Sequence, residues 1–361
     1  MHRLCLMVIA LLVGVAVSNA VAVQRADAPS GARVTVARRE ALLQQVAASV
    51  SAVRARPPGA TQLTPPPTPL INSRAWNAAE RMALWPAAPP NGTFVPATLP
   101  ADWPAPFVAN VASPELRVFP AQQPNGQAVL VIPGGGYQFV SVENEGADFA
   151  ARLNARGYTV FVLVYRLPSE GWQRGEDVPL QDAQRAMRVI RANAARWKID
   201  PRTVAVVGFS AGGHLAATLS TGFAEPVYVP ADGADAASAR PFAAALIYPV
   251  VTMAMPGTHP VSRELLLGPN PLPSQVARRS AELHVSAETP PLLLVHAMDD
   301  AAVPVSNSLN LLTAMRAAGR PVEAHLFQEG GHAFASGYPN SPTSSWIAVF
   351  DAWLARLRTS P

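Results

Sequence analysis

The sequence predicts an α/β fold with a mostly parallel sheet and helices on both of its faces. From residue 128 onward, short apolar runs alternate with stretches of helical spacing. Two of the runs, 158–165 and 202–208, are apolar at nearly every position, which is typical of central parallel strands. Strands that alternate with helices need right-handed crossovers, and these place helices on both faces of the sheet.

The N-terminal part of the chain differs from the rest in composition. Residues 1–22 combine an early Arg3, an apolar run and small residues, as in a secretory signal peptide, with an uncleaved anchor as the alternative. Residues 23–81 form an N-terminal extension with one helical pattern and a proline-rich linker at 57–69. We therefore expect a secreted or periplasmic protein with one catalytic domain over 82–358 and no stable membrane insertion after signal removal.

Composition excludes several kinds of chemistry. The one cysteine, Cys5, lies in the predicted signal peptide, so the mature chain has no thiol for a disulfide, a cysteine nucleophile or a cysteine-ligated metal. The formal net charge is +4, but no basic run follows the pattern of a phosphate-binding surface, and no nucleic-acid partner is expected. We also expect no metal and no organic cofactor.

The predicted elements follow one another in a regular order. Strands are expected at 128–133, 158–165, 202–208, 242–249, 290–296 and 321–327. Helices are expected at 145–156, at 182–197, from 211 onward, at 305–318 and at 345–358. Residues 250–288 are rich in proline and serine and are expected to form a short cap insertion with one modest helix at most. Ligands of such sheets bind beyond the carboxyl ends of the strands, so the loops there should carry the site.

The segment G-F-S-A-G at 208–212 matches the pattern G-x-S-x-G. It lies between a predicted strand and a predicted helix, which is the setting of a serine nucleophile on a sharp turn. Ser210 would also fit the N-cap of the following helix, but capping alone does not need the flanking glycines. The two roles are compatible, and the sequence predicts Ser210 as the nucleophile.

A serine hydroxyl needs a base to take its proton and an acid to orient that base. His325 and His332 are the histidines beyond the acidic candidates in the chain. His325 falls inside a strand pattern, whereas His332 lies in a glycine-rich loop, so His332 is the predicted base and an ordinary surface histidine is the alternative. Asp300, at the end of the preceding strand, is the predicted acid, and Asp299 is expected to turn the loop.

Negative charge on a reacting carbonyl oxygen needs donors that are already in place. The N–H of Ala211, directly after the serine, is one candidate. A second should come from the loop after the first predicted strand, where glycines occupy positions 134–136. Those glycines allow close backbone approach, although by themselves they would also fit a simple turn.

Together these segments resemble the secreted bacterial α/β-hydrolase esterases of the acetylxylan esterase type, close to the carbohydrate acetylesterase and feruloyl esterase group. The resemblance rests on ALWPAAPP (83–90), IPGGGY (132–137), NEGADFAARLNARGY (144–158), VYRLP (164–168), DAQRAMRVIRANA (182–194), GFSAGGHLA (208–216), RPFAAALIYPV (240–250), LLLG (265–268), HAMDD (296–300) and GGHAF (330–334). It implies the α/β-hydrolase fold over about 82–357. The site that it implies has Ser210 as nucleophile, Asp300 as acid, His332 as base, and Gly135, Gly136 and Ala211 as oxyanion donors.

Three more residues match positions of this family. Arg166, Asp182 and His214 are expected to be structural, with Asp182 capping its helix and His214 supporting the turn after the serine. Many related enzymes carry histidine where this chain has Pro133, which leaves the exact donor pair of the glycine loop open.

The expected activity is the hydrolysis of small acyl esters by a serine esterase, most of all acetyl groups on plant polysaccharides such as xylan. A short cap implies an open cleft, which suits an acyl group on a polymer. Tyr137, Trp172 and Tyr338 are candidates for stacking on sugar rings, with packing in the core or rim as the alternative for each. A feruloyl esterase, a general short-chain carboxylesterase or lipase, a prolyl-peptidase-like hydrolase and a non-catalytic binding protein are the other readings.

Overall fold

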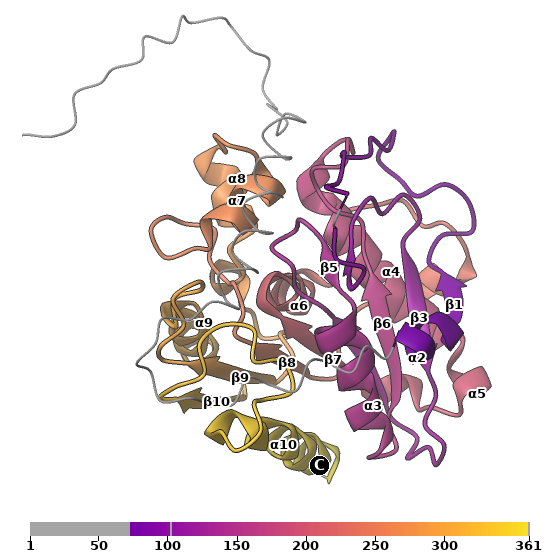
Figure 1. The fold of residues 1–361 in the computed structure, drawn as a ribbon, viewed down its shortest axis with the longest axis vertical. Coiled ribbons are helices and arrows are strands. Elements are labelled where there is room, and N and C mark those ends of the chain that lie inside the picture. Colours follow the sequence, from indigo (N-terminus) through magenta and orange to yellow (C-terminus); the bar gives the residue numbers. More distant parts are fainter. Residues whose placement is uncertain (1–72, 102, 360–361) are drawn as a thin grey trace, which may run out of the picture. The chain divides into compact units, whose positions relative to one another are not determined.

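The computed structural model describes residues 73–101 and 103–359 (Figure 1). Its main sheet has eight strands in the order β1-β3-β6-β4-β7-β8-β9-β10. They are β1 (Glu80–Ala83), β3 (Glu115–Phe119), β4 (Ala128–Ile132), β6 (Thr159–Val164), β7 (Val204–Phe209), β8 (Ala244–Ile247), β9 (Leu292–Ala297) and β10 (Val322–Phe327). β3 pairs antiparallel with β1 and β6, and every later pair is parallel. The predicted mostly parallel sheet is confirmed.

Helices cover both faces of this sheet. One core cluster joins strand side chains to α4 (Val178–Ala192), α6 (Ser210–Gly222) and α9 (Ser306–Ala317). The other joins them to α3 (Asp148–Asn154) and α10 (Trp346–Thr359). Because neighbouring side chains of a strand point to opposite faces, each central strand contributes to both clusters and is apolar at successive positions.

The predicted strands correspond to β4, β6, β7, β8, β9 and β10, and the antiparallel edge was not predicted. β1 has adjacent charged residues, Glu80 and Arg81, and is mostly exposed, whereas in β3 the charged Glu115 and Arg117 alternate with buried apolar residues. Neither strand is a continuous apolar run. The chain is already folded before the predicted domain start at residue 82. α2 (Ser73–Ala78) precedes β1, and the Arg117 guanidinium of β3 lies 4.9 Å from the Trp76 ring centroid. A short second sheet pairs β2 (Phe107–Val108) with β5 (Val140–Ser141).

The segment over 250–288 contains two helices where at most one was expected. They are α7 (Pro260–Leu267) and α8 (Pro273–Arg278), drawn in orange in Figure 1. Each begins with proline, which fits a first helical turn because the N–H there has no partner within the helix. A buried Arg279 then pairs with Asp177 and Glu225, and this fixes the insertion to the rest of the domain.

The remaining short helices are η1 (Glu143–Ala147), η2 (Gly175–Asp177), α5 (Ala194–Trp197), η3 (Pro201–Thr203), η4 (Gly233–Ala236), η5 (Ala281–His284) and η6 (Pro342–Ser345). The predicted signal peptide, the N-terminal helical pattern and the proline-rich linker lie outside the described residues. Within the described part, no helix has both the length and the apolar character needed to cross a membrane.

Candidate active site

Ser210 lies at the junction between β7 and α6, at the carboxyl end of the sheet. Its φ is +52°, a left-handed conformation that is strained for a residue with a side chain. α6 comes so close to β4 that a Cβ on Gly212 would overlap the carbonyl oxygen of Ile132. Gly212 is therefore needed for α6 to pack against β4. The sharp turn leaves the Ser210 side chain at the edge of the core.

Ser210, His332 and Asp300 form a continuous hydrogen-bonded chain. Ser210 Oγ lies 2.8 Å from His332 Nε2, and His332 Nδ1 lies 2.7 Å from Asp300 Oδ2. A carboxylate only accepts, so Nδ1–H donates to Asp300 and the unprotonated Nε2 accepts from the serine hydroxyl. In this arrangement the imidazole can take the serine proton, which is the chemistry needed to form an oxygen nucleophile.

The Asp300 carboxylate is held by four donors. Oδ1 accepts from the backbone N–H groups of Ala302 and Val303, each at 2.9 Å. Oδ2 accepts from His332 and, at 3.2 Å, from His296 Nε2. Burial acts to raise the pKa of Asp300, but the hydrogen bonds from His296 and His332 outweigh it and hold that pKa well below its usual range. Asp300 is thus ionised and fixed in orientation.

His296 is a part of this network to which the sequence analysis assigned no role. It is buried in β9, and its Nδ1 lies 2.8 Å from Ser308 Oγ. Its Nε2 faces both Asp300 Oδ2 and the carbonyl oxygen of Val303, two acceptors, so Nε2 carries the proton and Nδ1 accepts from the serine. The sequence feature that could have indicated its role is its position next to the carboxyl end of a predicted strand.

Asp299 does more than turn its loop. Its Oδ1 accepts the N–H of Gly331 at 2.7 Å, directly before the predicted base. This bond ties the loop after β9 to the loop after β10, so the loops of the predicted acid, Asp300, and the predicted base, His332, are fixed relative to each other.

The glycine loop after β4 lies against the nucleophile. A Cβ built on Gly134 would lie 2.9 Å from Ser210 Cβ, and Gly135 has φ of +127°, which only glycine adopts readily. Among the described residues, no hydrogen bond is donated by the N–H groups of Gly135, Gly136 or Ala211. These three donors are therefore free to bind an oxygen at the site, as the oxyanion prediction requires.

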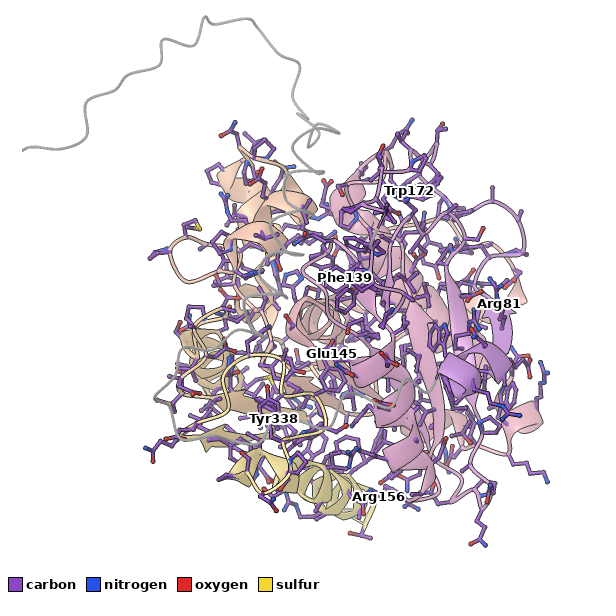
Figure 2. All side chains as sticks on the ribbon, in the orientation of Figure 1. Arg81, Phe139, Glu145, Arg156, Trp172 and Tyr338 are labelled. Carbon is purple, nitrogen blue, oxygen red and sulfur yellow. The ribbon has the colours of Figure 1, made fainter. Side chains whose placement is uncertain are left out.

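A second buried carboxylate supports the same loop. Glu145 Oε2 accepts the N–H of Gly134 at 2.6 Å, and Oε1 accepts from Tyr248 Oη at 2.8 Å. The Tyr248 hydroxyl in turn accepts the N–H of Ala335 at 3.0 Å, and its ring lies 5.0 Å from the His332 ring. Burial raises the pKa of Glu145 above its usual value. The glycine loop and the histidine loop are thus joined through Glu145, labelled near the middle of Figure 2.

The three aromatic residues predicted to stack on sugars lie in different surroundings. Tyr137 is 1% exposed and its hydroxyl bonds to His214 Nδ1 at 2.7 Å. Trp172 is 4% exposed and packs under the Arg166 guanidinium at 4.9 Å. Both rings pack in the interior, so the packing alternative holds for them. Tyr338 is half-buried in the same loop as His332, far from Trp172 in Figure 2, and its role stays a prediction.

The family positions expected to be structural are buried. His214 bonds to Tyr137 and, through Nε2, to the carbonyl oxygen of Arg279 at 2.7 Å, so it supports the first turn of α6 as expected. Asp182 is not a helix cap, because α4 begins at Val178. Its carboxylate instead pairs with the buried Arg166 at 2.8 Å. Within the described residues, no group of three or more His, Cys, Asp or Glu side chains could hold a metal ion.

The sheet order, the serine turn and the strand-end positions of the acid and the base define an α/β-hydrolase. The BD-FAE family model matches residues 118–315, which is more than half of the chain. The chain therefore belongs to the BD-FAE family. The expectation of a relationship to esterases is confirmed by this match and by the relatives below.

The chain is similar to proteins that are named as esterases or xylanases. An acetylxylan esterase of Xylanibacter ruminicola is 32% identical over 247 residues, which are 67% of this chain and 47% of that protein. Endo-1,4-beta-xylanase B of Butyrivibrio fibrisolvens is 36% identical over 56% of this chain and 32% of its own length. The chain thus spans less than half the length of these two curated relatives. Among solved structures, the acetyl ester-xyloside bifunctional hydrolase of Caldicellulosiruptor lactoaceticus is 31% identical, with a TM-score of 0.65 over 78% of this chain and 98% of that one.

Proposed function

We propose that this protein is a serine esterase that removes small acyl groups, above all acetyl groups, from plant polysaccharides or oligosaccharides such as xylan. The observation that carries the proposal is the chain of hydrogen bonds from Ser210 through His332 to Asp300, with the serine on a strained turn. The relatedness to carboxylic ester hydrolases supports the reaction class.

The geometry suggests the following course. Ser210 Oγ attacks the ester carbonyl while His332 Nε2 takes its proton, and Asp300 stabilises the resulting imidazolium. The N–H groups of Ala211 and of Gly135 or Gly136 bind the developing oxyanion, each contributing roughly 10²–10³ in rate. His332 then gives its proton to the leaving alcohol, and a water molecule, activated by the same histidine, releases the acid from the acyl-enzyme.

Acetyl xylan is proposed as the substrate class because the acetylxylan esterase and the acetyl ester-xyloside hydrolase named above are similar to this chain. A group of aromatic rings beside the glycine loop adds support. Phe107 stacks on Phe139 with ring centroids 4.3 Å apart, and Trp103 lies 5.9 Å from Phe139. Trp103 and Phe107 are partly exposed and would suit a sugar ring or, in the alternative, a feruloyl ring.

Secretion is part of the proposal and rests on the pattern of residues 1–22 alone. An enzyme for plant polysaccharide needs access to a polymer outside the cell. Cell fractionation with N-terminal sequencing of the purified protein tests this part. A mature chain that begins near residue 23 in the periplasm or medium supports export, and a cytoplasmic chain that still begins at Met1 contradicts it.

The activity is tested with the Ser210→Ala variant beside a matched control, Ser345→Ala, which alters an exposed serine of η6 whose hydroxyl bonds to the carbonyl oxygen of Pro342. Both proteins and the wild type are incubated with acetylated xylan, feruloylated arabinoxylan and 4-nitrophenyl esters of increasing chain length. We expect acetate release to fall by roughly 10⁴-fold or more in Ser210→Ala only. Retained hydrolysis in that variant would refute the mechanism, and a preference for acyl chains of about eight carbons or more would refute the acetyl specificity.

A further inference from the structure

A histidine of the cap insertion faces the glycine loop. His259 is the N-cap residue of α7, and a Cβ built on Gly136 would lie 3.8 Å from its Cε1 atom. The ring also interacts electrostatically with His332 and Asp300, so it lies close to the catalytic pair. The insertion therefore places an imidazole beside the predicted oxyanion donors.

The hydrogen bonds of His259 fix which nitrogen carries the proton. Its Nδ1 accepts the backbone N–H of Ser262 at 3.3 Å and lies 2.8 Å from Ser262 Oγ. An Nδ1 that accepts from a backbone N–H leaves the proton of a neutral ring on Nε2. Burial lowers the pKa of His259 to about 4, with a further lowering by His332, so the ring is neutral near pH 7. His259 thus presents an uncharged N–H donor.

That donor has no partner in the part of the chain that the structure describes. Among the described residues, none accepts a hydrogen bond from His259 Nε2, and this atom is not one of the fully buried polar atoms that lack a partner. It is therefore open to a ligand. By contrast, His214 and His296, the other histidines near the site apart from His332, have both ring nitrogens bonded within the protein.

Gln138 supplies a second polar group at the same place. Its Nε2 would lie 3.3 Å from a Cβ on Gly136. The side chain is only 2% exposed, yet its Oε1 has no hydrogen-bond partner in the described structure. This oxygen is fully buried, so the amide presents its Nε2 atom to the site, which has no hydrogen-bond partner among the described residues and is not one of the fully buried unpartnered atoms. An unpartnered donor and an unpartnered amide therefore flank Gly136 together.

We propose that His259 and Gln138 form a polar subsite that binds the hydroxyl groups of the alcohol part of the ester. The assignment to the alcohol follows from chemistry. An acetyl group offers one polar atom, the carbonyl oxygen, and the backbone N–H groups of Gly135, Gly136 and Ala211 are already placed to bind it. The acetyl methyl group cannot use a further N–H donor or amide. Neighbouring hydroxyls of a polyol can use both, since each hydroxyl donates and accepts.

This inference rests on the proposed esterase activity and adds the group that selects the substrate. Aryl and simple alkyl acetates have no hydroxyl to offer, whereas an acetylated xyloside does. A site built to bond a substrate hydroxyl discriminates strongly against a substrate without it, because the buried polar groups are then left unpaired. The subsite would thus separate a carbohydrate esterase from a general short-chain esterase.

The test compares kcat/KM for a monoacetylated methyl xyloside with kcat/KM for 4-nitrophenyl acetate. In His259→Asn the shorter amide keeps an oxygen that can cap α7 but loses the donor at the Nε2 position. Gln138→Met keeps the length of the side chain and removes its amide. We expect each variant to lower the ratio of xyloside to aryl ester at least tenfold. His325→Asn, on the edge strand β10, is the matched control and should leave the ratio within about twofold of the wild type.

Each result separates the subsite from the reaction. An equal loss on both esters in His259→Asn, with a melting temperature like that of the wild type, contradicts the subsite, because the residue then acts on the shared acyl part. An unchanged ratio in both variants contradicts it as well. A wild-type protein that cleaves neither ester contradicts the proposed esterase itself, before any variant is considered.

Discussion

Two buried carboxylates are connected to His332, Asp300 directly and Glu145 through Tyr248, and the protein uses them differently. Asp300 bonds directly to the imidazole, and its hydrogen bonds hold its pKa well below the usual range despite burial. Glu145 acts at a distance, through the N–H of Gly134 and the hydroxyl of Tyr248, and burial raises its pKa. The number and kind of donors, and not burial alone, decide in which direction the pKa of each group moves.

The difference points to two separate tasks. Asp300 fixes the tautomer and direction of the imidazole, a task that needs a full negative charge. Glu145 joins the glycine loop to the loop of the base, a task that depends on accepting two hydrogen bonds. Substituting one carboxylate at a time tests whether the two tasks are separate.

The largest effect is expected for Asp300→Asn. The asparagine cannot accept from His332 and His296 as the carboxylate does, and the imidazole loses its preferred tautomer. We expect kcat toward 4-nitrophenyl acetate to fall by roughly 10³–10⁴-fold. The neighbouring Asp299→Asn is the control, because it affects only the bond to Gly331. A loss of similar size in both variants would show that loop integrity, and not the charge on Asp300, is what matters.

A smaller loss of activity is expected for Glu145→Gln. A glutamine has one acceptor oxygen, so it cannot serve both Gly134 and Tyr248 in the way the carboxylate does. The glycine loop should shift relative to the serine. We expect kcat to fall by roughly 10- to 100-fold, which is less than the loss expected on removal of an oxyanion donor. Steady-state kinetics on 4-nitrophenyl acetate measures this. A loss as large as that of Asp300→Asn would mean that the two carboxylates share one task.

Tyr248→Phe should change stability more clearly than activity. The phenyl ring keeps its contact with His332 but leaves Glu145 Oε1 and the N–H of Ala335 without a partner. We expect the free energy of unfolding to fall by about 1–3 kcal/mol, as measured by urea denaturation. Tyr228→Phe, which removes a half-buried hydroxyl bonded to Asp235 and Arg188, is the control for the loss of a hydrogen-bonded tyrosine hydroxyl at another position. If Tyr248→Phe is as stable as the wild type, the Tyr248 hydroxyl contributes nothing to the hydrogen bonds that link the two loops.

The smallest effect is a difference in how stability depends on pH. The pKa of Glu145 is raised in the folded state, so its unfolded form ionises first and the protein loses stability as the pH rises above 4.5. The pKa of Asp300 is lowered, so its contribution is complete above 3.8 and is lost as the pH falls below that value. The free energy of unfolding of Glu145→Gln, relative to that of the wild type, should therefore increase as the pH is raised above 4.5. Urea denaturation at a series of pH values gives the free energy of unfolding of each protein. If this free energy changes with pH in the same way for both proteins, the raised pKa of Glu145 is contradicted.

Several features followed from local patterns in the sequence. Apolar runs gave the positions of the parallel strands, and the serine turn was recognisable from the glycines at 208 and 212. The positions of the acid and the base followed from strand ends. These features depend on residues that are close together in the chain, and the structure brings Ser210, Asp300 and His332 into hydrogen-bond contact.

Other features could not be predicted because they depend on contacts between distant segments. Glu145 and Tyr248 are 103 residues apart in the chain and meet only when the sheet is assembled. The interiors around Tyr137 and Trp172 are likewise made by several segments, so their exposure was not readable from the local sequence. The edge strand β1 is short and charged, and only its pairing with β3 makes it a strand.

Short-range periodicity and residue type were enough to predict the α/β order and the residues proposed as nucleophile, base and acid. The tertiary structure alone decided which polar groups would be satisfied and which would stay open. That outcome requires all neighbours of a group to be in place, since a hydrogen bond forms only at a definite distance and direction. It separates His214 and His296, whose nitrogens are all bonded within the protein, from His259, whose ring lies beside the glycine loop and whose Nε2 has no partner among the described residues.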